Sequence, residues 1–318
     1  MSLPEAARSP GRAPPLVVLF GPTAVGKSAI LASLVDDRFE VINADSMQVY
    51  RSMDIGTAKP ARELLRRLPH HLIDVAEPSH QFNAGEFVKA SEALAAQIRQ
   101  RGRVPLVCGG TAFYITSFLY GLPESPPGDP AARARLRELA RVEGSGALAR
   151  LLREKDPVAA DRIPAGDTYR ITRALEVLES TGESVYSFRW PRTPRDDFQF
   201  LILGLRRDRE ELYRRIEERV DRMFSEGLLG EVKKLLAMGY EASDPGMRGI
   251  GYREILSMRS GCETLAGVRE LIKRNSRRYA KRQLTFFRSV HGVRWFHPAD
   301  APLMRATIES FLAQSPGP

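Results

Sequence analysis

The segment from Gly21 to Ser28, which reads GPTAVGKS, has the residue types and spacing of a phosphate-binding loop. It fits G-x-x-x-x-G-K-[ST], a pattern in which backbone N–H groups surround phosphates, the lysine reaches a terminal phosphate and the last hydroxyl binds Mg²⁺. An apolar strand candidate, Leu16–Phe20, precedes it, and a helix candidate, Ala29–Val35, follows it and adds partial positive charge. The sequence therefore predicts a di- or triphosphate site, with a chance glycine turn as the alternative.

A second candidate for chemistry is Asp45, which follows the apolar strand candidate Phe39–Ala44. Open α/β sheets place their chemistry at the carboxyl ends of the strands. There Asp45 can deprotonate a nucleophile, act as the base for a substrate hydroxyl in a small-molecule kinase, or help to hold metal. The alternative is an N-cap for the following turn. The strand candidate Val104–Cys108 ends in Gly109-Gly110 without an acid, which counts against a motor-type NTPase.

The segment Arg269–Arg288 is a third signal, because it carries eight basic residues and the single acid Glu270. As a helix it places Arg274, Arg278, Lys281 and Arg282 on one side, interleaved with Tyr279, Phe286 and Phe287. Such a stripe suits a nucleic-acid backbone, with aromatic rings available for stacking. The alternative is a solvated helix face whose aromatic side chains enter the core.

The elements that position these residues alternate between strands and helices, which predicts a parallel sheet. Two further strand candidates are His70–Val75 and Phe198–Gly204, and Val293–Phe296 is a possible edge strand. The proline-rich segment after residue 122 introduces a helical pattern from residue 131 to about 178. We therefore predict a disordered tail at 1–15, a catalytic core formed by 16–123 and 191–318, and a helical insertion domain at 124–190.

The composition of the 318 residues narrows the class of protein. A formal charge of +9 favours polyanionic partners, although charge alone is weak support for them. Only two cysteines are present, Cys108 and Cys262, without metal-ligand spacing, which favours a reducing compartment. No apolar run approaches the roughly 20 residues of a membrane span. We expect a cytoplasmic protein in which nothing demands more than a monomer.

With these motifs the chain resembles the tRNA dimethylallyltransferases of bacterial type, the adenosine isopentenyltransferases of tRNA. The resemblance covers about residues 16 to 296. It implies a P-loop NTP-hydrolase-like α/β fold, a parallel sheet flanked by helices, with a smaller all-helical insertion. Eight blocks match in the family's order: GPTAVGKS, NADSMQVYRSMDIGTAKP, HHLIDV, VCGGTAFY, GDTYRITRALEV, RIEERVDRMFSEGLLGEV, MRGIGYRE and YAKRQLTFFR.

The resemblance implies transfer of a dimethylallyl group from dimethylallyl diphosphate to N6 of adenosine 37 in tRNA, giving N6-(dimethylallyl)adenosine and diphosphate. It implies that Asp45 is the base for the adenine amine, and that Lys27 and Mg²⁺ neutralise the leaving group. Thr111 and Arg219 match positions that contact the diphosphate or align the substrates. The implied diphosphate-binding residues are Gly21, Pro22, Thr23, Ala24, Val25, Gly26, Lys27 and Ser28, with Ser28 as the metal ligand.

The resemblance also implies a tRNA anticodon stem-loop as partner, with adenosine 37 flipped out of its stack and the insertion domain closing over it. The matching tRNA-binding positions are Asp45, Ser46, Met47, Gln48, Tyr169, Arg170, Ile171, Thr172, Arg173, Arg248, Gly249, Ile250, Gly251, Tyr252, Arg253, Lys281, Arg282, Gln283 and Arg288.

The chain departs from the family pattern at a few of these positions. Met47 stands where arginine is common, Val25 where serine is common, and Tyr169 where glutamine is frequent; Ala112-Phe113 replaces a common Gly-Leu pair. These departures bear on fine positioning. Two alternatives remain: a P-loop kinase of a nucleoside or small metabolite with Asp45 as base, and a nucleic-acid-binding ATPase without transferase chemistry. Neither explains the eight matching blocks.

Overall fold

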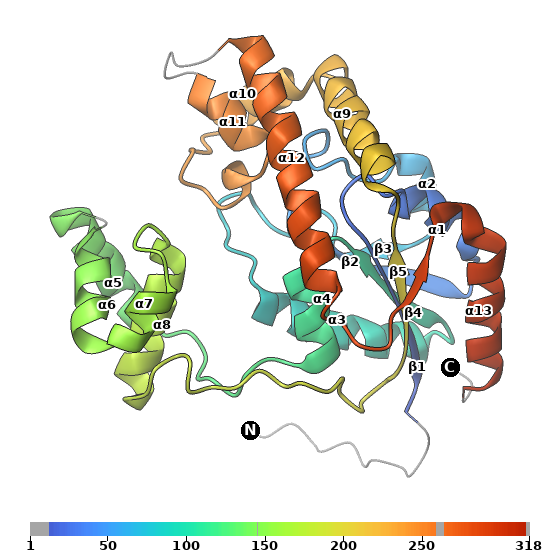
Figure 1. Ribbon diagram of the computed structural model, residues 1–318, viewed down its shortest axis with the longest axis horizontal. Coiled ribbons are helices and arrows are strands. Elements are labelled where there is room, and N and C mark those ends of the chain that lie inside the picture. Colours follow the sequence, from blue (N-terminus) through green and yellow to red (C-terminus); the bar gives the residue numbers. More distant parts are fainter. Residues whose placement is uncertain (1–12, 145, 259–263, 316–318) are drawn as a thin grey trace. The chain divides into compact units, whose positions relative to one another are not determined.

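The computed structural model describes residues 13–144, 146–258 and 264–315, which contain one six-stranded parallel sheet. The strand order is β3-β2-β4-β1-β5-β6 (Figure 1). The strands are β1 (Pro15–Phe20), β2 (Phe39–Ala44), β3 (His70–His71), β4 (Val104–Gly109), β5 (Gln199–Leu205) and β6 (Arg294–Phe296). Every neighbouring pair is parallel, which confirms the predicted fold class.

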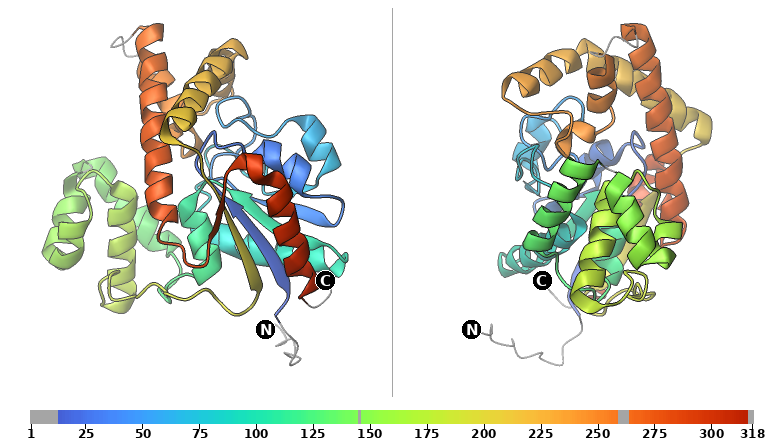
Figure 2. Two further views of the ribbon diagram at one scale, coloured as in Figure 1. Left: turned by 45° about the vertical axis from the view of Figure 1, so that its right-hand side comes forward. Right: turned by 90° about the vertical axis from the view of Figure 1, so that its left-hand side faces the viewer.

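Helices cover both faces of this sheet (Figure 2). On one face Val17 and Leu19 of β1 share a buried cluster with Ile30 of α1 (Lys27–Leu34) and Met304 of α13 (Ala301–Ala313). On the other face α3 (Ala84–Gln100) and α4 (Ala112–Tyr120) pack, and the ring of Phe118 in α4 lies 6.2 Å from that of Phe200 in β5. Burial on both faces explains why the strands read as continuous apolar runs.

Beyond the carboxyl ends of the strands, five helices pack around a second apolar cluster: α9 (Arg209–Ser225), α10 (Leu228–Ala237), η1 (Gly246–Arg248), α11 (Tyr252–Met258) and α12 (Leu265–Phe287). Its members include Val49 and Met53 from the loop after β2, Val220 of α9 and Ile272 of α12. The short helices α2 (Arg62–Arg67) and η2 (Pro298–Asp300) contribute no residue to this cluster, and Leu64 of α2 packs against the first one.

The chain divides into two compact units, one formed by residues 1–119 with 195–318 and one by residues 120–194. The second unit contains α5 (Pro130–Glu143), α6 (Gly146–Lys155), α7 (Pro157–Arg162) and α8 (Thr168–Thr181). Leu136, Leu148 and Leu175 belong to its own buried core, and Arg133 pairs with the buried Glu176 at 2.6 Å. The sequence predicted an insertion at 124–190, and its predicted contact with tRNA stays a prediction.

Several elements differ from the sequence-based expectation. The predicted strand His70–Val75 contains only β3, because Leu72 and Asp74 have φ of 61° and 56°, which an extended strand does not adopt. Pro15 belongs to β1 rather than to the tail, at the first strand position, where a missing N–H is tolerated.

The helix α13 was not predicted from the sequence. Residues 1–12 of the predicted tail and Cys262 lie outside the described residues. Among the helices of the described segments, none is long and apolar enough to cross a membrane.

Candidate active site

The carboxyl ends of four parallel strands bring the predicted chemistry to one edge of the sheet. The phosphate loop follows β1, Asp45 follows β2, Thr111 follows β4 and Arg207 follows β5. In space β4 lies between β1 and β2, so Asp45 stands two strands from the loop. This edge is where doubly wound sheets hold their ligands.

The phosphate loop turns sharply between β1 and α1. Ala24 and Gly26 have φ of 62° and 109°, and the conformation of Gly26 is one that a side chain disfavours. Lys27 folds back over the loop and its Nζ donates to Gly21 O at 2.9 Å and to Pro22 O at 3.0 Å. The motif therefore forms in the strand–loop–helix context that the sequence predicted.

The amine of Lys27 is buried at the centre of the site. Burial lowers its pKa to about 8, Cys108 and Asp45 act in the opposite direction, and Arg219 lowers it further. An anion bound at the loop would supply the negative charge that this buried amine lacks. Lys27 can therefore form an ion pair with an anion bound at this loop.

Asp45 uses one carboxylate oxygen as a cap and leaves the other open. Oδ1 accepts from Met47 N–H at 2.9 Å and from Gln48 N–H at 3.4 Å. Oδ2 makes no hydrogen bond to any described residue, and Asp45 lines a small cavity of about 40 Å³ together with Lys27 and Ser28. The two readings of Asp45 from sequence, as a cap and as a base, are therefore compatible.

Thr111 connects the end of β4 to the residue after Asp45. Its Oγ1 accepts from Ser46 N–H at 2.8 Å and donates to Ser46 Oγ at 3.1 Å. Tyr279 of α12 hydrogen-bonds to Thr111 as well, although burial and Asp45 still raise the Tyr279 pKa to about 12. Tyr279 therefore stays a neutral phenol beside the carboxylate.

Three arginines from α9 and the segment before it lie at this site, and two of them contact the phosphate loop. Arg207 Nε donates to Val25 O at 2.8 Å, and Arg215 Nε donates to Ala24 O at 3.0 Å. Arg219, one turn beyond Arg215, donates to Thr57 O at 3.3 Å. Burial lowers the Arg219 pKa, opposed by Asp45. The sequence analysis identified Arg219 but not Arg207 or Arg215. The sequence indicated Arg215 only through its spacing of four residues from Arg219, which places both on one side of a helix.

Gln283 connects α12 to the phosphate loop through hydrogen bonds. Its Oε1 accepts from Thr23 N–H at 2.9 Å, and its Nε2 donates to Gly110 O at 2.7 Å. The side chain is buried, so its amide faces the loop rather than the surface. The sequence placed Gln283 among the RNA contacts, and nothing local in the sequence indicated the loop contact.

The oxygen atoms at this edge of the sheet fit a magnesium ion that is coordinated mainly by the bound phosphate compound and by water. No group of three or more His, Cys, Asp and Glu residues within the described segments could hold a metal alone. Mg²⁺ typically takes one or two protein oxygens and fills its octahedron with phosphate and water. Ser28 and Asp45 line the same cavity as Lys27, and the Ser28 hydroxyl is a protein oxygen of the kind that such a site requires.

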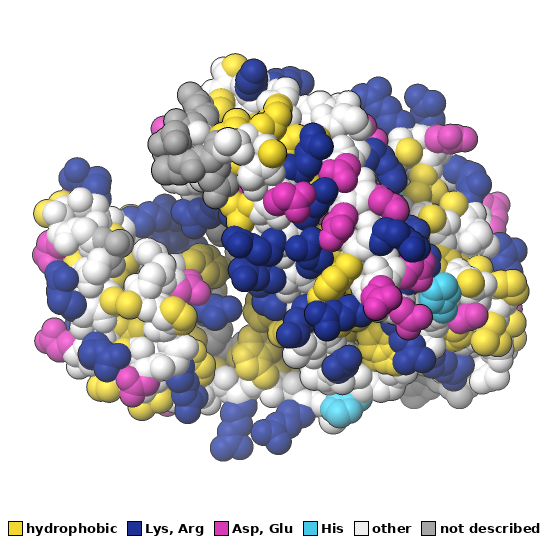
Figure 3. Space-filling model, turned by 45° about the horizontal axis from the view of Figure 1, so that its top comes forward, with side chains coloured by type: hydrophobic (Ala, Val, Ile, Leu, Met, Phe, Trp, Pro, Cys, Tyr) yellow, Lys and Arg dark blue, Asp and Glu magenta, His cyan; other side chains and the backbone are white. Residues whose placement is uncertain are grey.

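The residues predicted to bind tRNA divide into exposed and buried groups. In the first unit Arg248, Arg253, Lys281, Arg282 and Arg288 are exposed, while Ser46, Met47 and Ile250 are half-buried. Lys and Arg side chains gather in several clusters on this surface, with acidic groups between them (Figure 3).

The residues of the buried group make hydrogen bonds and packing contacts inside the protein. Gln48 donates to Thr57 O and Ala58 O, Tyr252 donates to Glu231 at 2.6 Å, and Gly249 packs beneath Met47. Gly251 is also buried.

In the second unit the predicted tRNA-binding residues occupy the start of α8. Tyr169 and Arg170 are exposed and Arg173 is half-buried, whereas Ile171 and Thr172 are buried. Helix periodicity accounts for this split, because consecutive residues of a helix turn to different sides.

The chain matches a family model described as IPP transferase over residues 48–290. It is 44% identical over 301 residues to a protein of Geotalea daltonii named tRNA dimethylallyltransferase 2, covering 93% of this chain and 92% of the relative. It is 45% identical over 288 residues to the tRNA dimethylallyltransferase of Geobacter sulfurreducens, covering 90% and 93%.

Solved structures agree with these matches. The full-length tRNA isopentenylpyrophosphate transferase of Bacillus halodurans superposes with a TM-score of 0.67 at 37% identity, covering 93% of this chain and 96% of the other. A eukaryotic dimethylallyltransferase acting on tRNA superposes with a TM-score of 0.77 at 25% identity, covering 96% and 81%.

Proposed function

The chain belongs to the IPP transferase family of tRNA dimethylallyltransferases, and we propose that its phosphate loop and Asp45 carry the transfer reaction. The donor is dimethylallyl diphosphate and the acceptor is N6 of adenosine 37 in tRNA. The products are N6-(dimethylallyl)adenosine and diphosphate. The kinase alternative loses its support, because the relatives and structural neighbours are transferases that act on tRNA.

One observation carries the assignment of residues. Asp45 and Lys27 line the same small cavity at the carboxyl edge of the sheet, and they interact electrostatically. A carboxylate with one open oxygen and a buried amine are the two groups that this transfer needs, one for the proton and one for the leaving group. A phosphate loop holding a diphosphate leaving group needs no strand-end acid for hydrolysis, which accounts for Gly109-Gly110 at the end of β4.

The proposed step exchanges one bond for another. The N6 lone pair of adenosine attacks C1 of the dimethylallyl group, the bond from C1 to the diphosphate oxygen breaks, and diphosphate leaves with that electron pair. The amine loses a proton to the open Oδ2 of Asp45. An exocyclic amine is a weak nucleophile, so a carboxylate base at hydrogen-bond distance assists it.

The leaving group is stabilised by fixed positive charge. In this proposal loop N–H groups, Lys27 and Arg219 bind the developing negative charge. Arg207 and Arg215 support the loop by donating to the carbonyls of Val25 and Ala24. We assign Ser28 as the protein ligand of Mg²⁺, which would neutralise diphosphate charge when bound. Thr111 aligns the backbone after Asp45 through Ser46.

The acceptor reaches this site only if the adenine leaves the anticodon stack. We propose that the exposed residues Arg248, Arg253, Lys281, Arg282 and Arg288 contact the anticodon stem-loop, together with Tyr169, Arg170 and Arg173 of the second unit. Since tRNA is the substrate, we also propose that the enzyme is cytoplasmic. We further propose that it acts as a monomer.

The direct test incubates the protein with Mg²⁺, dimethylallyl diphosphate and unmodified tRNA, followed by mass analysis of the nucleosides. We expect a dimethylallyl mass on adenosine at position 37, and its loss in Asp45→Asn. No transfer by the wild-type protein, with ATP consumed and a small molecule phosphorylated instead, would overturn the proposed function.

A further inference from the structure

Glu231 of α10 is a half-buried acid that takes no part in the proposed transfer step. Its Oε2 accepts the backbone N–H groups of Asp54 and Ile55 at 2.8 and 2.7 Å. Its Oε1 accepts the backbone N–H of Gly56 at 3.0 Å and the hydroxyl of Tyr252 at 2.6 Å. Three consecutive backbone N–H groups therefore converge on one carboxylate, an arrangement that proteins otherwise use to bind anions.

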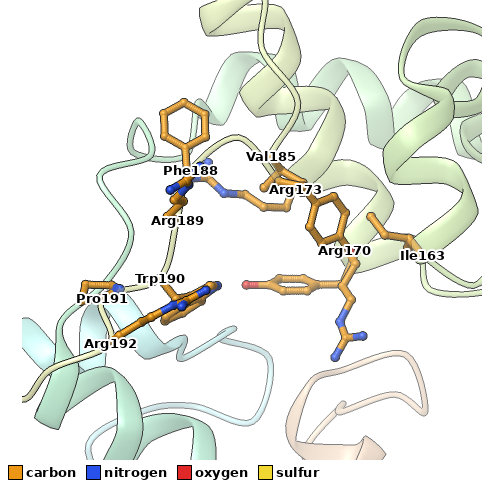
Figure 4. A pocket seen from close by; sticks show the side chains of 11 residues that line it. Ile163, Arg170, Arg173, Val185, Phe188, Arg189, Trp190, Pro191 and Arg192 are labelled. Carbon is orange, nitrogen blue, oxygen red and sulfur yellow. The ribbon is translucent and has the colours of Figure 1, made fainter.

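Both oxygens of this carboxylate are engaged by groups of the protein itself. A side chain that binds a ligand keeps its polar atoms accessible, and Arg192, beside the Trp190 ring in the second unit, is exposed in this way (Figure 4). Burial and Glu231 together raise the pKa of Tyr252, which therefore stays a neutral phenol and keeps donating. The contacts of Glu231 thus hold a segment of the chain in place.

The segment that Glu231 binds is a tight turn closed on itself. Ala58 N–H donates to Ile55 O at 3.0 Å, and Lys59 N–H donates to Asp54 O at 3.1 Å. Because these two bonds connect the end of the turn to its beginning, its carbonyl groups are fixed together with the N–H groups that Glu231 accepts.

The carbonyl of Thr57, inside this turn, is hydrogen-bonded to two side chains of the donor site. It accepts from Arg219 Nη2 at 3.3 Å and from Gln48 Nε2 at 3.2 Å. Gln48 lines the small cavity together with Lys27 and Asp45. Arg219 interacts electrostatically with both of those residues. An unbroken series of contacts therefore leads from the carboxylate on α10 to the charged groups around the phosphate loop.

We propose that Glu231 is a positioning residue of the donor site, which fixes the turn at 54–59 so that Thr57 O holds the guanidinium of Arg219 against the bound diphosphate. The inference rests on the proposed function for diphosphate as the ligand. A side chain that is already oriented loses less conformational entropy when its ligand binds. The fixed carbonyl of Thr57 therefore favours binding of the diphosphate by Arg219.

The variant Glu231→Gln tests this inference, because charge and positioning predict opposite results. Removing a negative charge would by itself strengthen the binding of an anion. A glutamine has only one accepting oxygen, so in either orientation its amide N–H₂ faces at least one of the three backbone N–H groups. We expect the Kd of diphosphate with Mg²⁺, measured by calorimetry, to increase about tenfold. A Kd that decreases or stays unchanged in folded Glu231→Gln would overturn the inference.

Glu226→Gln is the matched control, because Glu226 is an exposed acid at the end of α9 and its substitution removes the same charge. We expect no increase in the diphosphate Kd of this variant. Equal increases in Glu226→Gln and Glu231→Gln would overturn the positioning role in favour of a general effect of charge.

A double-mutant cycle tests whether Glu231 acts through Arg219. Arg219→Lys keeps the positive charge but loses the planar set of donors that can contact a carbonyl and an anion together. We expect Glu231→Gln to cause little further increase in the diphosphate Kd when Arg219→Lys is already present. Losses that multiply in the double variant would show that the two residues act independently, and would overturn the inference.

Tyr252→Phe decides the question if Glu231→Gln does not fold. It removes one of the four donors to the carboxylate and keeps both the ring and the three backbone hydrogen bonds. We expect a smaller increase in the diphosphate Kd, again absent when Arg219→Lys is present. An unchanged Kd in Tyr252→Phe would then overturn the inference.

Dimethylallyl transfer is measured on the same preparations to separate this inference from the proposed function. Transfer by the wild-type protein, without coupling between Glu231 and Arg219 in diphosphate binding, overturns the positioning role alone. Coupling in diphosphate binding without transfer by the wild-type protein supports the positioning role and overturns the proposed function.

Discussion

Gln283 accepts a hydrogen bond from the backbone N–H of Thr23 at 2.9 Å, across 260 residues of sequence. The same side chain donates to Gly110 O at 2.7 Å, so one buried amide of α12 joins the phosphate loop to the end of β4. Because α12 also carries the exposed basic residues proposed to contact tRNA, the helix connects the acceptor surface to the donor site. Thr23 N–H is thereby engaged within the protein, and the phosphate-binding donors must come from the rest of the loop.

Removing this amide should impair the donor site more than the acceptor surface. Gln283→Ala leaves Thr23 N–H and Gly110 O without partners, and a buried unsatisfied group costs about 1–3 kcal/mol. We expect KM for dimethylallyl diphosphate to rise about tenfold with tRNA affinity little changed, as measured by steady-state kinetics and filter binding. Thr285→Ala, two residues along the same helix and exposed, is the control. If Gln283→Ala lowered the affinity for tRNA as much as the affinity for dimethylallyl diphosphate, the proposed role of Gln283 in positioning the phosphate loop would be contradicted.

Asp45 can be tested as a base without removing its cap. Asp45→Asn retains an oxygen that can accept from Met47 N–H, but its amide takes up no proton. We expect kcat to fall about 10²- to 10⁴-fold, the typical contribution of a general base, with tRNA affinity within a few-fold of wild type. Single-turnover transfer with bound tRNA measures this directly. Turnover unchanged in Asp45→Asn would exclude Asp45 as the base.

Much of this architecture was predictable, because it depends on local patterns. The strands are buried on both faces and so read as apolar runs, and the phosphate loop is a contiguous motif with an obligatory strand and helix around it. Asp45 was predictable from its place after β2. Each of these features is determined by residues that are close together in the sequence, so it can be predicted from a local pattern.

Contacts between distant segments were not predictable, and Tyr252 illustrates why. The sequence suggested an RNA contact for it, whereas the structure buries its ring against Gly56, where an added Cβ would lie 2.5 Å from Tyr252 Cζ. Its hydroxyl donates to Glu231, which also accepts the backbone N–H groups of Asp54, Ile55 and Gly56. Tyr252 is the first residue of α11, and its burial depends on the segments that pack over it, which are α10 and the loop around Gly56.

The charge of Lys27 should make donor binding depend on pH. Its pKa of about 8 in the protein means that it loses its proton as the pH rises through 8, well below the ordinary value of 10.5. The inhibition constant of diphosphate should therefore increase above pH 8. Lys27→Arg keeps its charge throughout this range and is the control for titration of diphosphate itself. An identical pH profile in both proteins would show that Lys27 titrates outside the range measured.

Glu40 should contribute stability that acid removes. Arg101 binds both of its oxygens, at 2.9 and 2.7 Å, and His71 binds one at 2.6 Å, and these partners lower the Glu40 pKa to about 2. A depressed carboxylate pKa stabilises the fold above the unfolded value of 4.5, and that stability is lost as the pH falls towards 2. The Tm difference between wild type and Glu40→Gln should be largest near neutral pH and shrink below pH 4.5. A Tm difference that does not change with pH would show that Glu40 stabilises the fold through packing rather than through its charge.

The basic stripe of α12 should appear in the salt dependence of tRNA binding. Arg278 and Arg282 are exposed, and Arg282 lies over the ring of Tyr279 at 5.8 Å. Each phosphate contact contributes about −0.7 to −0.9 to the slope of log K against log salt, so Arg278→Ala with Arg282→Ala should flatten that slope by about 1 to 2. Arg277→Ala is the matched control, because Arg277 is already paired with Glu217 at 2.6 Å and should leave the slope unchanged. An unaltered slope in the double variant would mean that Arg278 and Arg282 lie on a solvated helix face and do not contact tRNA. The contacts to the tRNA backbone would then have to come from Arg248, Arg253 and the second unit.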